Sequence, residues 1–444
     1  MIKTNKQINI QLLAFASQLI PAIIGVVSFM ILVRTAKPIV LGQYIIYIAA
    51  VGLFEMVKSC GLQSALVMRV SGSNQDQQLT ITGSAYWLGA VMSFSLSAIL
   101  CIFYFSGIFA QQPGIQVFCG WYAILGIITL PLHLAEASAV AKQDLKFILL
   151  LRFLQSTSAL IVALYAYFKG GQLETFATIN LLFTGGLMLL VLIAGKTNPL
   201  QIRFKTMQEV KALFNLIKYT LATLATTNFL KSADTFLIGS LMGPINVAKY
   251  AIPLKLTELF EIPLRSLSTT AFPQLATKYN NNDMPGFKKA FIQYFSWAYM
   301  LYIPTLIIAF ILAPYIVLII GGHQYAETTS IFRVFILYAL LLPTDRLTGI
   351  SLDALQLPSE NFKKVFIMAF VNILADILAI QFTHQLEWVA FASVLNAATG
   401  AFLGWWMLKN KGILQTGKIW NEVNAYSFSF LKNGIQHLKS SLKH

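Results

Sequence analysis

Long apolar stretches separated by short polar segments occupy most of the 444-residue chain. A helix needs about 20 apolar residues to cross the hydrocarbon core of a membrane. Twelve stretches reach that length, and each predicts a spanning helix. They cover roughly residues 8–33, 40–68, 80–105, 116–141, 146–168, 174–195, 212–242, 246–276, 289–320, 330–356, 364–384 and 386–408.

The basic residues between these stretches predict how the chain is oriented. Cytoplasmic segments of membrane proteins carry an excess of Lys and Arg. With a cytoplasmic N-terminus, the cytoplasmic segments hold 20 Lys and Arg, and the opposite side holds three, namely Arg34, Lys37 and Lys169. A wrong number of spans would mix the two sets. We therefore predict twelve spans with both termini in the cytoplasm.

Composition supports an integral membrane protein. The chain is 57% hydrophobic and 11% charged, whereas soluble domains are about 25% charged. Its net charge of +15 reflects topology and contact with anionic lipid, and excludes nucleic acid because no soluble basic domain is present. The apolar stretch 8–33 is too long for a signal peptide and is expected to be the first span. Cys60, Cys101 and Cys119 show no disulfide or metal spacing, and we expect no metal and no cofactor.

A repeat divides the chain into halves. PIVLGQYIIYIAAVGLFE (38–55) and PINVAKYAIPLKLTELFE (244–261) match at seven of 18 positions, with an offset of 244 − 38 = 206 residues. The two copies lie six predicted spans apart and therefore cross the membrane in the same direction. This predicts an all-α protein with two parallel-repeat, six-helix lobes around a central cavity. The expected domains are an N-terminal lobe (1–195), a cytoplasmic linker (196–211), a C-terminal lobe (212–408) and a basic cytoplasmic tail (409–444).

Charged side chains inside the predicted spans are the candidate functional residues. Each would cost about 2.5–3.5 kcal/mol at a helix centre facing lipid, so they must line a hydrated cavity or pair with one another. Glu55 with Lys58, Lys231 with Asp234, and Lys255 with Glu258 are three residues apart, and Glu261 and Arg265 are four apart, so each pair can meet on one helix face. Simple mutual neutralisation of these pairs is the alternative.

A surplus of cations predicts an anionic substrate such as a phosphate or pyrophosphate. The candidate cavity cations are Lys58, Arg152, Lys231, Lys255, Arg265, Arg333 and Arg346. The charge partners expected to position them are Glu55, Asp234, Glu258, Glu261 and Asp345. Asp376 and Glu136 have no nearby cation in the sequence and are candidates for coupling to H⁺ or Na⁺, or for protonated structural groups. Enzyme motifs are absent, so we expect a transporter, with no catalytic residues.

Two segments carry a family resemblance. LVRTAKPIVLGQYIIYIAAVGLFEMVKSCGLQSALVMR (32–69) and SADTFLIGSLMGPINVAKYAIPLKLTELFEIPLRSLSTTAFPQLATKY (232–279) resemble the first-to-second and seventh-to-eighth span signatures of polysaccharide flippases. These flippases form part of the multidrug/oligosaccharidyl-lipid/polysaccharide exporter superfamily. The resemblance covers most of residues 1–410.

The resemblance implies two lobes around a V-shaped cavity and an undecaprenyl-pyrophosphate-linked oligosaccharide as substrate. It further implies transfer from the cytoplasmic to the periplasmic leaflet of a bacterial inner membrane, for O-antigen, capsule or exopolysaccharide assembly. The expected partners are this substrate, membrane lipids and glycan polymerases, with a monomer as the working unit. The alternatives are an ion-coupled antiporter of the same superfamily, a peptidoglycan lipid flippase, and a membrane glycan polymerase or ligase. The first span lacks the acidic residue usual in antiporters. A polymerase would normally have a large external loop, and the sequence predicts none.

Overall fold

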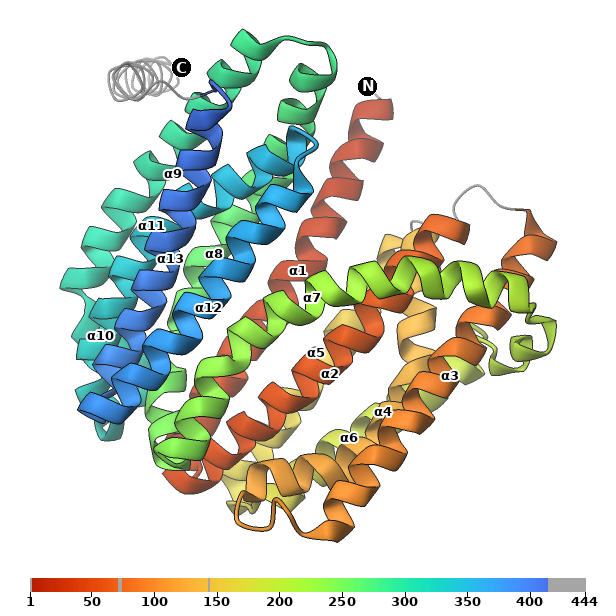
Figure 1. The fold of residues 1–444 in the computed structure, drawn as a ribbon. Helices are drawn as coiled ribbons and strands as arrows, with labels where there is room; N and C mark the ends of the chain where they lie inside the picture. Colours follow the sequence, from red (N-terminus) through yellow and green to blue (C-terminus); the bar gives the residue numbers. More distant parts are fainter. Residues whose placement is uncertain (1, 71–73, 143, 414–444) are drawn as a thin grey trace. The chain divides into compact units, whose positions relative to one another are not determined.

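The computed structural model describes residues 2–70, 74–142 and 144–413, and these are helical apart from short connections (Figure 1). The helices of the first part of the chain are α1 (Ile2–Thr35), α2 (Pro38–Val70), α3 (Gln75–Ser106), α4 (Pro113–Ala141), α5 (Leu145–Lys169), α6 (Leu173–Ile193), the 3₁₀ helix η1 (Pro199–Phe204) and α7 (Met207–Leu241). Those that follow are α8 (Pro244–Asn280), α9 (Met284–Ile311), α10 (Ala313–Gly321), the 3₁₀ helix η2 (His323–Thr328), α11 (Thr329–Ala354), α12 (Pro358–Thr383) and α13 (Leu386–Asn410).

Proline and glycine set several of the helix boundaries. The helices α2, α4, α8 and α12 each begin with proline, which has the backbone angle of a helix and lacks only an N–H that the first turn leaves unbonded. At the other end, α3 stops at Gly107, whose φ of 68° is left-handed and is adopted most readily by glycine. The helices therefore alternate with tight turns, as the short polar segments of the sequence predict.

The chain divides into two compact units, 1–248 and 249–444. In the first unit, α1 packs on α5, and α2 packs on both α4 and α7. In the second, α13 packs on α11 and α12, and α9 packs on α11. The helix α7, which the sequence assigned to the C-terminal lobe, thus groups with the first unit through α2 and α3. The two predicted six-helix lobes stay a prediction.

Nine helical segments within the described residues are long and apolar enough to span a membrane, and the protein is a multi-pass membrane protein. The sequence predicted twelve spans, more than the nine found among the described residues. The stretch 289–320 is not one continuous helix, because α9 ends at Ile311 and α10 begins at Ala313. The predicted span 246–276 lies within α8, which carries several charged residues and three internal prolines, Pro253, Pro263 and Pro273. The part of the predicted basic tail at 414–444 lies outside the described residues.

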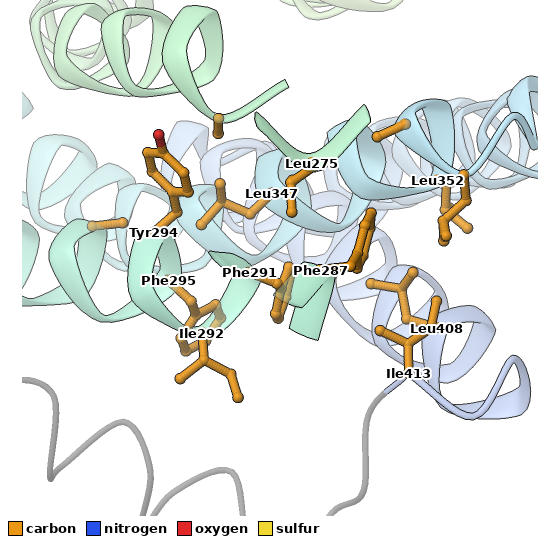
Figure 2. Close-up of a cluster of buried hydrophobic side chains, with 14 residues drawn as sticks. Leu275, Phe287, Phe291, Ile292, Tyr294, Phe295, Leu347, Leu352, Leu408 and Ile413 are labelled. Carbon is orange, nitrogen blue, oxygen red and sulfur yellow. The ribbon is translucent and has the colours of Figure 1, made fainter. Parts of the chain in front are cut away.

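Aromatic packing forms the interior of the second unit. Phe287 and Phe291 of α9 are almost fully buried beside Leu275 of α8, Leu347 of α11 and Leu408 of α13 (Figure 2). In contrast, many large apolar side chains are exposed on helix surfaces throughout the described chain. An apolar surface of this extent is unfavourable in water and suits contact with lipid. The cluster in Figure 2 packs α8, α9, α11 and α13 against one another.

Candidate functional site

Glu55 of α2 is held by three side chains of α4. Its Oε1 accepts hydrogen bonds from the Tyr122 hydroxyl at 2.7 Å and the Thr129 hydroxyl at 2.9 Å. Its Oε2 lies in contact with Nε2 of His133. The three donors recur seven and four residues apart, so they share one face of α4. This carboxylate thus joins two helices; its predicted partner Lys58 has a side chain outside the described residues.

Arg152 and Glu136 form an ion pair across the α4–α5 hairpin. The guanidinium Nε and Nη2 each lie 2.9 Å from Oε1 of Glu136. Glu136 lies five residues before the end of α4 and Arg152 seven residues after the start of α5, about 8 and 11 Å into their helices. The sequence shows no partner for either residue, because the pairing depends on two helices meeting at the turn. Their roles in substrate binding and ion coupling stay predictions.

The charged pairs predicted along α8 are present. Lys255 Nζ lies 2.6 Å from Glu258 Oε2, and Arg265 Nη2 lies 2.9 Å from Glu261 Oε2. The Glu258 and Arg265 side chains are 52% and 53% exposed. Exposed ion pairs contribute only about 0–1 kcal/mol, so a substrate anion could compete for either cation at little cost.

Stacked aromatic rings place these charges beside α11. Phe260 of α8 stacks on Phe332, with ring centroids 6.4 Å apart, and Tyr250 meets Phe335 edge-on at 5.4 Å. Aromatic pairs at such separations are attractive beyond the area they bury. The helices α8 and α11, which carry four of the candidate cavity cations, are therefore neighbours.

The two arginines of α11 occupy different positions. Arg333 lies four residues after the helix begins, and its guanidinium carbon is 5.2 Å from the centroid of the Phe310 ring. Arg346 lies thirteen residues further along, about 20 Å deeper and about 140° around the helix axis. It is exposed and makes no ion pair with any residue that the structure describes. Of the two, Arg346 is the cation open to an anionic ligand well inside the helix.

A buried ion pair that the sequence did not indicate joins α11 to α12. Lys364 is 2% exposed, and its Nζ donates to Oδ1 of Asp345 at 2.7 Å and to the carbonyl oxygen of Asp345 at 2.9 Å. In the sequence Lys364 directly follows Lys363 in a short polar segment, and nothing there indicates that its side chain is buried. The helix α12 begins at Pro358, so Lys364 lies in its second turn and faces α11.

Glycines make room for this pair. A Cβ on Gly400 of α13 would lie 2.4 Å from Asp345 Oδ1, and one on Gly349 would lie 3.2 Å from Lys364 Nζ. Small residues at one face are what close helix packing in a membrane requires. Gly349 lies on α11 itself and Gly400 on α13, so the pair is enclosed by glycines of two helices.

The remaining candidate acids are buried. Asp376 is fully buried, and its Oδ2 accepts a hydrogen bond at 2.8 Å from Nδ2 of Asn372, one turn earlier on α12. Asp234 of α7 is 6% exposed. The side chain of its predicted partner Lys231 lies outside the described residues. No cluster of three or more His, Cys, Asp or Glu side chains suited to a metal occurs within the described part of the chain.

Comparisons with known proteins show the family. The model of a family described as polysaccharide biosynthesis protein matches residues 31–330. The probable low-salt glycan biosynthesis flippase Agl15 of Haloferax volcanii is 20% identical over 369 residues, which cover 82% of this chain and 75% of that protein.

Solved structures show the same fold at low identity. An inward-facing multidrug resistance MATE family transporter of the MOP superfamily has a TM-score of 0.74 at 12% identity, covering 91% of this chain and 99% of that one. The lipid II flippase MurJ, in an inward closed conformation, has a TM-score of 0.70 at 15% identity, covering 96% and 93%. The resemblance read from residues 32–69 and 232–279 is thereby confirmed, and the chain belongs to the polysaccharide biosynthesis protein family, a family of polysaccharide flippases.

Proposed function

We propose that this protein translocates an undecaprenyl-pyrophosphate-linked oligosaccharide from the cytoplasmic to the periplasmic leaflet by alternating access. The product serves O-antigen, capsule or exopolysaccharide assembly. The polyprenyl tail stays in lipid while the pyrophosphate and sugars cross in a hydrated cavity between two lobes, because neither group tolerates hydrocarbon. The family match and the flippase relative support this class of transport.

The observation that carries the proposal is the exposed cationic surface of α8 and α11. Arg346 has no ion pair within the described residues. Lys255 pairs with the exposed Glu258, and Arg265 pairs with the partly buried Glu261 on the same helix. A pyrophosphate accepts bidentate hydrogen bonds from guanidinium groups such as those of Arg265 and Arg346, and the Lys255 ammonium adds a third positive charge on the same pair of helices. Arg333 would contact the substrate nearer the start of α11. Arg152, Lys58 and Lys231 complete the proposed cationic set.

Ion coupling is the less direct part of the proposal. Asp376 is buried in α12, and Glu136 is bound to Arg152. Protonation or Na⁺ binding at either carboxylate would change the net charge buried between the packed helices. This change would favour one conformation of the transport cycle over the other. We further propose a bacterial inner-membrane location, cytoplasmic termini, a working monomer and glycan polymerase partners.

Substitution of the exposed cations tests the proposal. We expect Arg346→Gln to reduce polysaccharide export by roughly 10- to 100-fold at normal protein level, because a hydrogen bond to a charged group contributes about 1.5–3 kcal/mol. Lys255→Gln should act in the same direction, and Arg346→Lys should restore part of the activity. Lys289→Gln, an exposed cation of α9, is the matched control. Normal export in both Arg346→Gln and Lys255→Gln would contradict these assignments.

A further inference from the structure

The segment between α6 and α7 is a surface element fixed to α3, beside which Figure 1 draws it. A Cβ on Gly83 would lie only 2.1 Å from the carbonyl oxygen of Gln201, so the backbone of η1 rests directly on α3. The Thr206 N–H donates to the Ser84 hydroxyl at 3.2 Å. Ile202 packs against the buried apolar cluster of the first unit. The segment is thus held in one orientation.

The outward face of this element is apolar and cationic together. Leu200, Phe204 and Met207 are 60%, 55% and 58% exposed. Arg203 and Lys211 are also exposed, and neither makes an ion pair with a described residue. A face that combines exposed apolar groups with cations is typical of elements that lie in the headgroup region of a membrane.

Neighbouring charges do not cancel this positive face. Glu209, the acid nearest in sequence, is bound to Arg69 at 2.6 Å. Asp144, at the adjoining α4–α5 turn, binds Lys196 at 3.3 Å. A hydrogen bond from the Phe147 N–H, with a smaller contribution from Lys196, lowers the pKa of the Asp144 carboxyl below its ordinary value. Asp144 is therefore ionised at neutral pH and keeps Lys196 engaged.

The length of α6 places this face at membrane depth. Its 21 residues, Leu173–Ile193, extend about 32 Å, close to the roughly 30 Å thickness of the hydrocarbon core. Ile193, the last residue of α6, is 83% exposed. We therefore expect the chain to leave the hydrocarbon near Ile193, which would put residues 199–211 at the level of the lipid headgroups.

We propose that residues 199–211 form an anchor for acidic phospholipids of the surrounding bilayer. Leu200, Phe204 and Met207 insert at the boundary of the hydrocarbon, and Arg203, Lys205 and Lys211 bind lipid phosphates. Because the same element is fixed to α3 at Gly83, lipid binding holds the first unit at a defined depth beside the start of α7. This surface is distinct from the cations of α8 and α11, so the proposal does not depend on what the protein transports.

Hydrogen exchange of the full-length protein in nanodiscs tests the anchor. Amides of residues 200–207 should exchange more slowly as phosphatidylglycerol is added to phosphatidylcholine nanodiscs. Arg203→Gln with Lys211→Gln should raise the phosphatidylglycerol fraction needed for half of this protection by about 25-fold, at roughly fivefold per cation, or abolish protection over the accessible range. Lys205 stays in place because its Nζ lies 4.7 Å from the Trp87 ring centroid and its loss could disturb the docking.

Matched controls separate this anchor from other effects. Lys289→Gln with Lys409→Gln removes the same charge from exposed positions of the second unit and should leave protection of 200–207 unchanged. Leu200→Ser with Phe204→Ser should speed exchange of the segment even in phosphatidylcholine alone. Unchanged protection in the Arg203/Lys211 variant would overturn the proposal. Equal protection by inorganic phosphate would also overturn it, because the surface would then bind a free anion and not the bilayer.

Discussion

Replacement of Lys364 by methionine is the sharpest test of the buried pair between α11 and α12. The substitution keeps the length of the side chain and removes the ammonium group, so the Asp345 carboxylate loses its 2.7 Å partner. Breaking a buried ion pair from one side costs about 3–5 kcal/mol. The Asp345 side chain is 20% exposed and recovers some hydration, so we expect about 3 kcal/mol of lost stability.

Equilibrium unfolding in detergent, followed by circular dichroism and tryptophan fluorescence, measures this loss. Lys363→Met is the matched control, because the Lys363 side chain is 63% exposed and pairs only with Glu360 on the surface; it should change stability by less than about 0.5 kcal/mol. Asp345→Asn added to Lys364→Met should recover part of the loss, since no carboxylate then stays uncompensated. A Lys364→Met protein as stable as the Lys363→Met protein would refute the pairing.

Two further predictions concern helix contacts of the first unit. Gly42→Ala should destabilise the fold by roughly 1–3 kcal/mol, because its Cβ would lie 1.7 Å from the Pro244 carbonyl oxygen. The control is Gly52→Ala on the same helix, whose Cβ would meet no atom within 4 Å and which should be neutral or stabilising. Equal melting temperatures of the two variants would exclude the contact between Gly42 and Pro244. Glu55→Ala should cost about 1–3 kcal/mol in the same unfolding assay by leaving the donors of α4 unsatisfied, and its stability should then be insensitive to Tyr122→Phe. Additive losses in that double variant would separate Glu55 from Tyr122.

The helices could be predicted because each apolar stretch is long enough to be read from composition alone. The break between α9 and α10 could not, since the stretch 289–320 is apolar on both sides of it. Mean hydropathy indicates that a segment is surrounded by lipid or protein, but it does not show whether the segment forms one continuous helix. Pro314, in the first turn of α10, was the local signal, because proline favours the first turn of a new helix.

The candidate site was predictable only where its contacts are local. The pairs Lys255–Glu258 and Glu261–Arg265 follow from helical spacing, because three or four residues bring side chains onto one face. The bond between Arg152 and Glu136 depends on how α4 and α5 pack, and no spacing rule reports that register. Contacts between helices are set by side-chain shape across the whole interface.

His133 illustrates the same limit. In the sequence it lies three residues before Glu136, a spacing that puts both side chains on one face of α4, yet its ring contacts Glu55 of α2. The rotation of α4 about its own axis decides which acid the imidazole meets, and in this rotation Tyr122 and Thr129 on the same face also bond Glu55. Charged residues of a span can thus be found from sequence, while their partners on other helices come from the packing.

Reconstituted transport is the most direct test of the central claim. Purified protein in vesicles would be given a fluorescent undecaprenyl-pyrophosphate oligosaccharide in one leaflet, and its appearance in the other leaflet would be followed by an impermeant sugar-cleaving enzyme. The proposed function predicts protein-dependent transfer that slows in Arg346→Gln vesicles, with no change in oligosaccharide length. Lengthened glycan chains would identify a polymerase, and transfer no faster than in protein-free vesicles would contradict a flippase for this substrate.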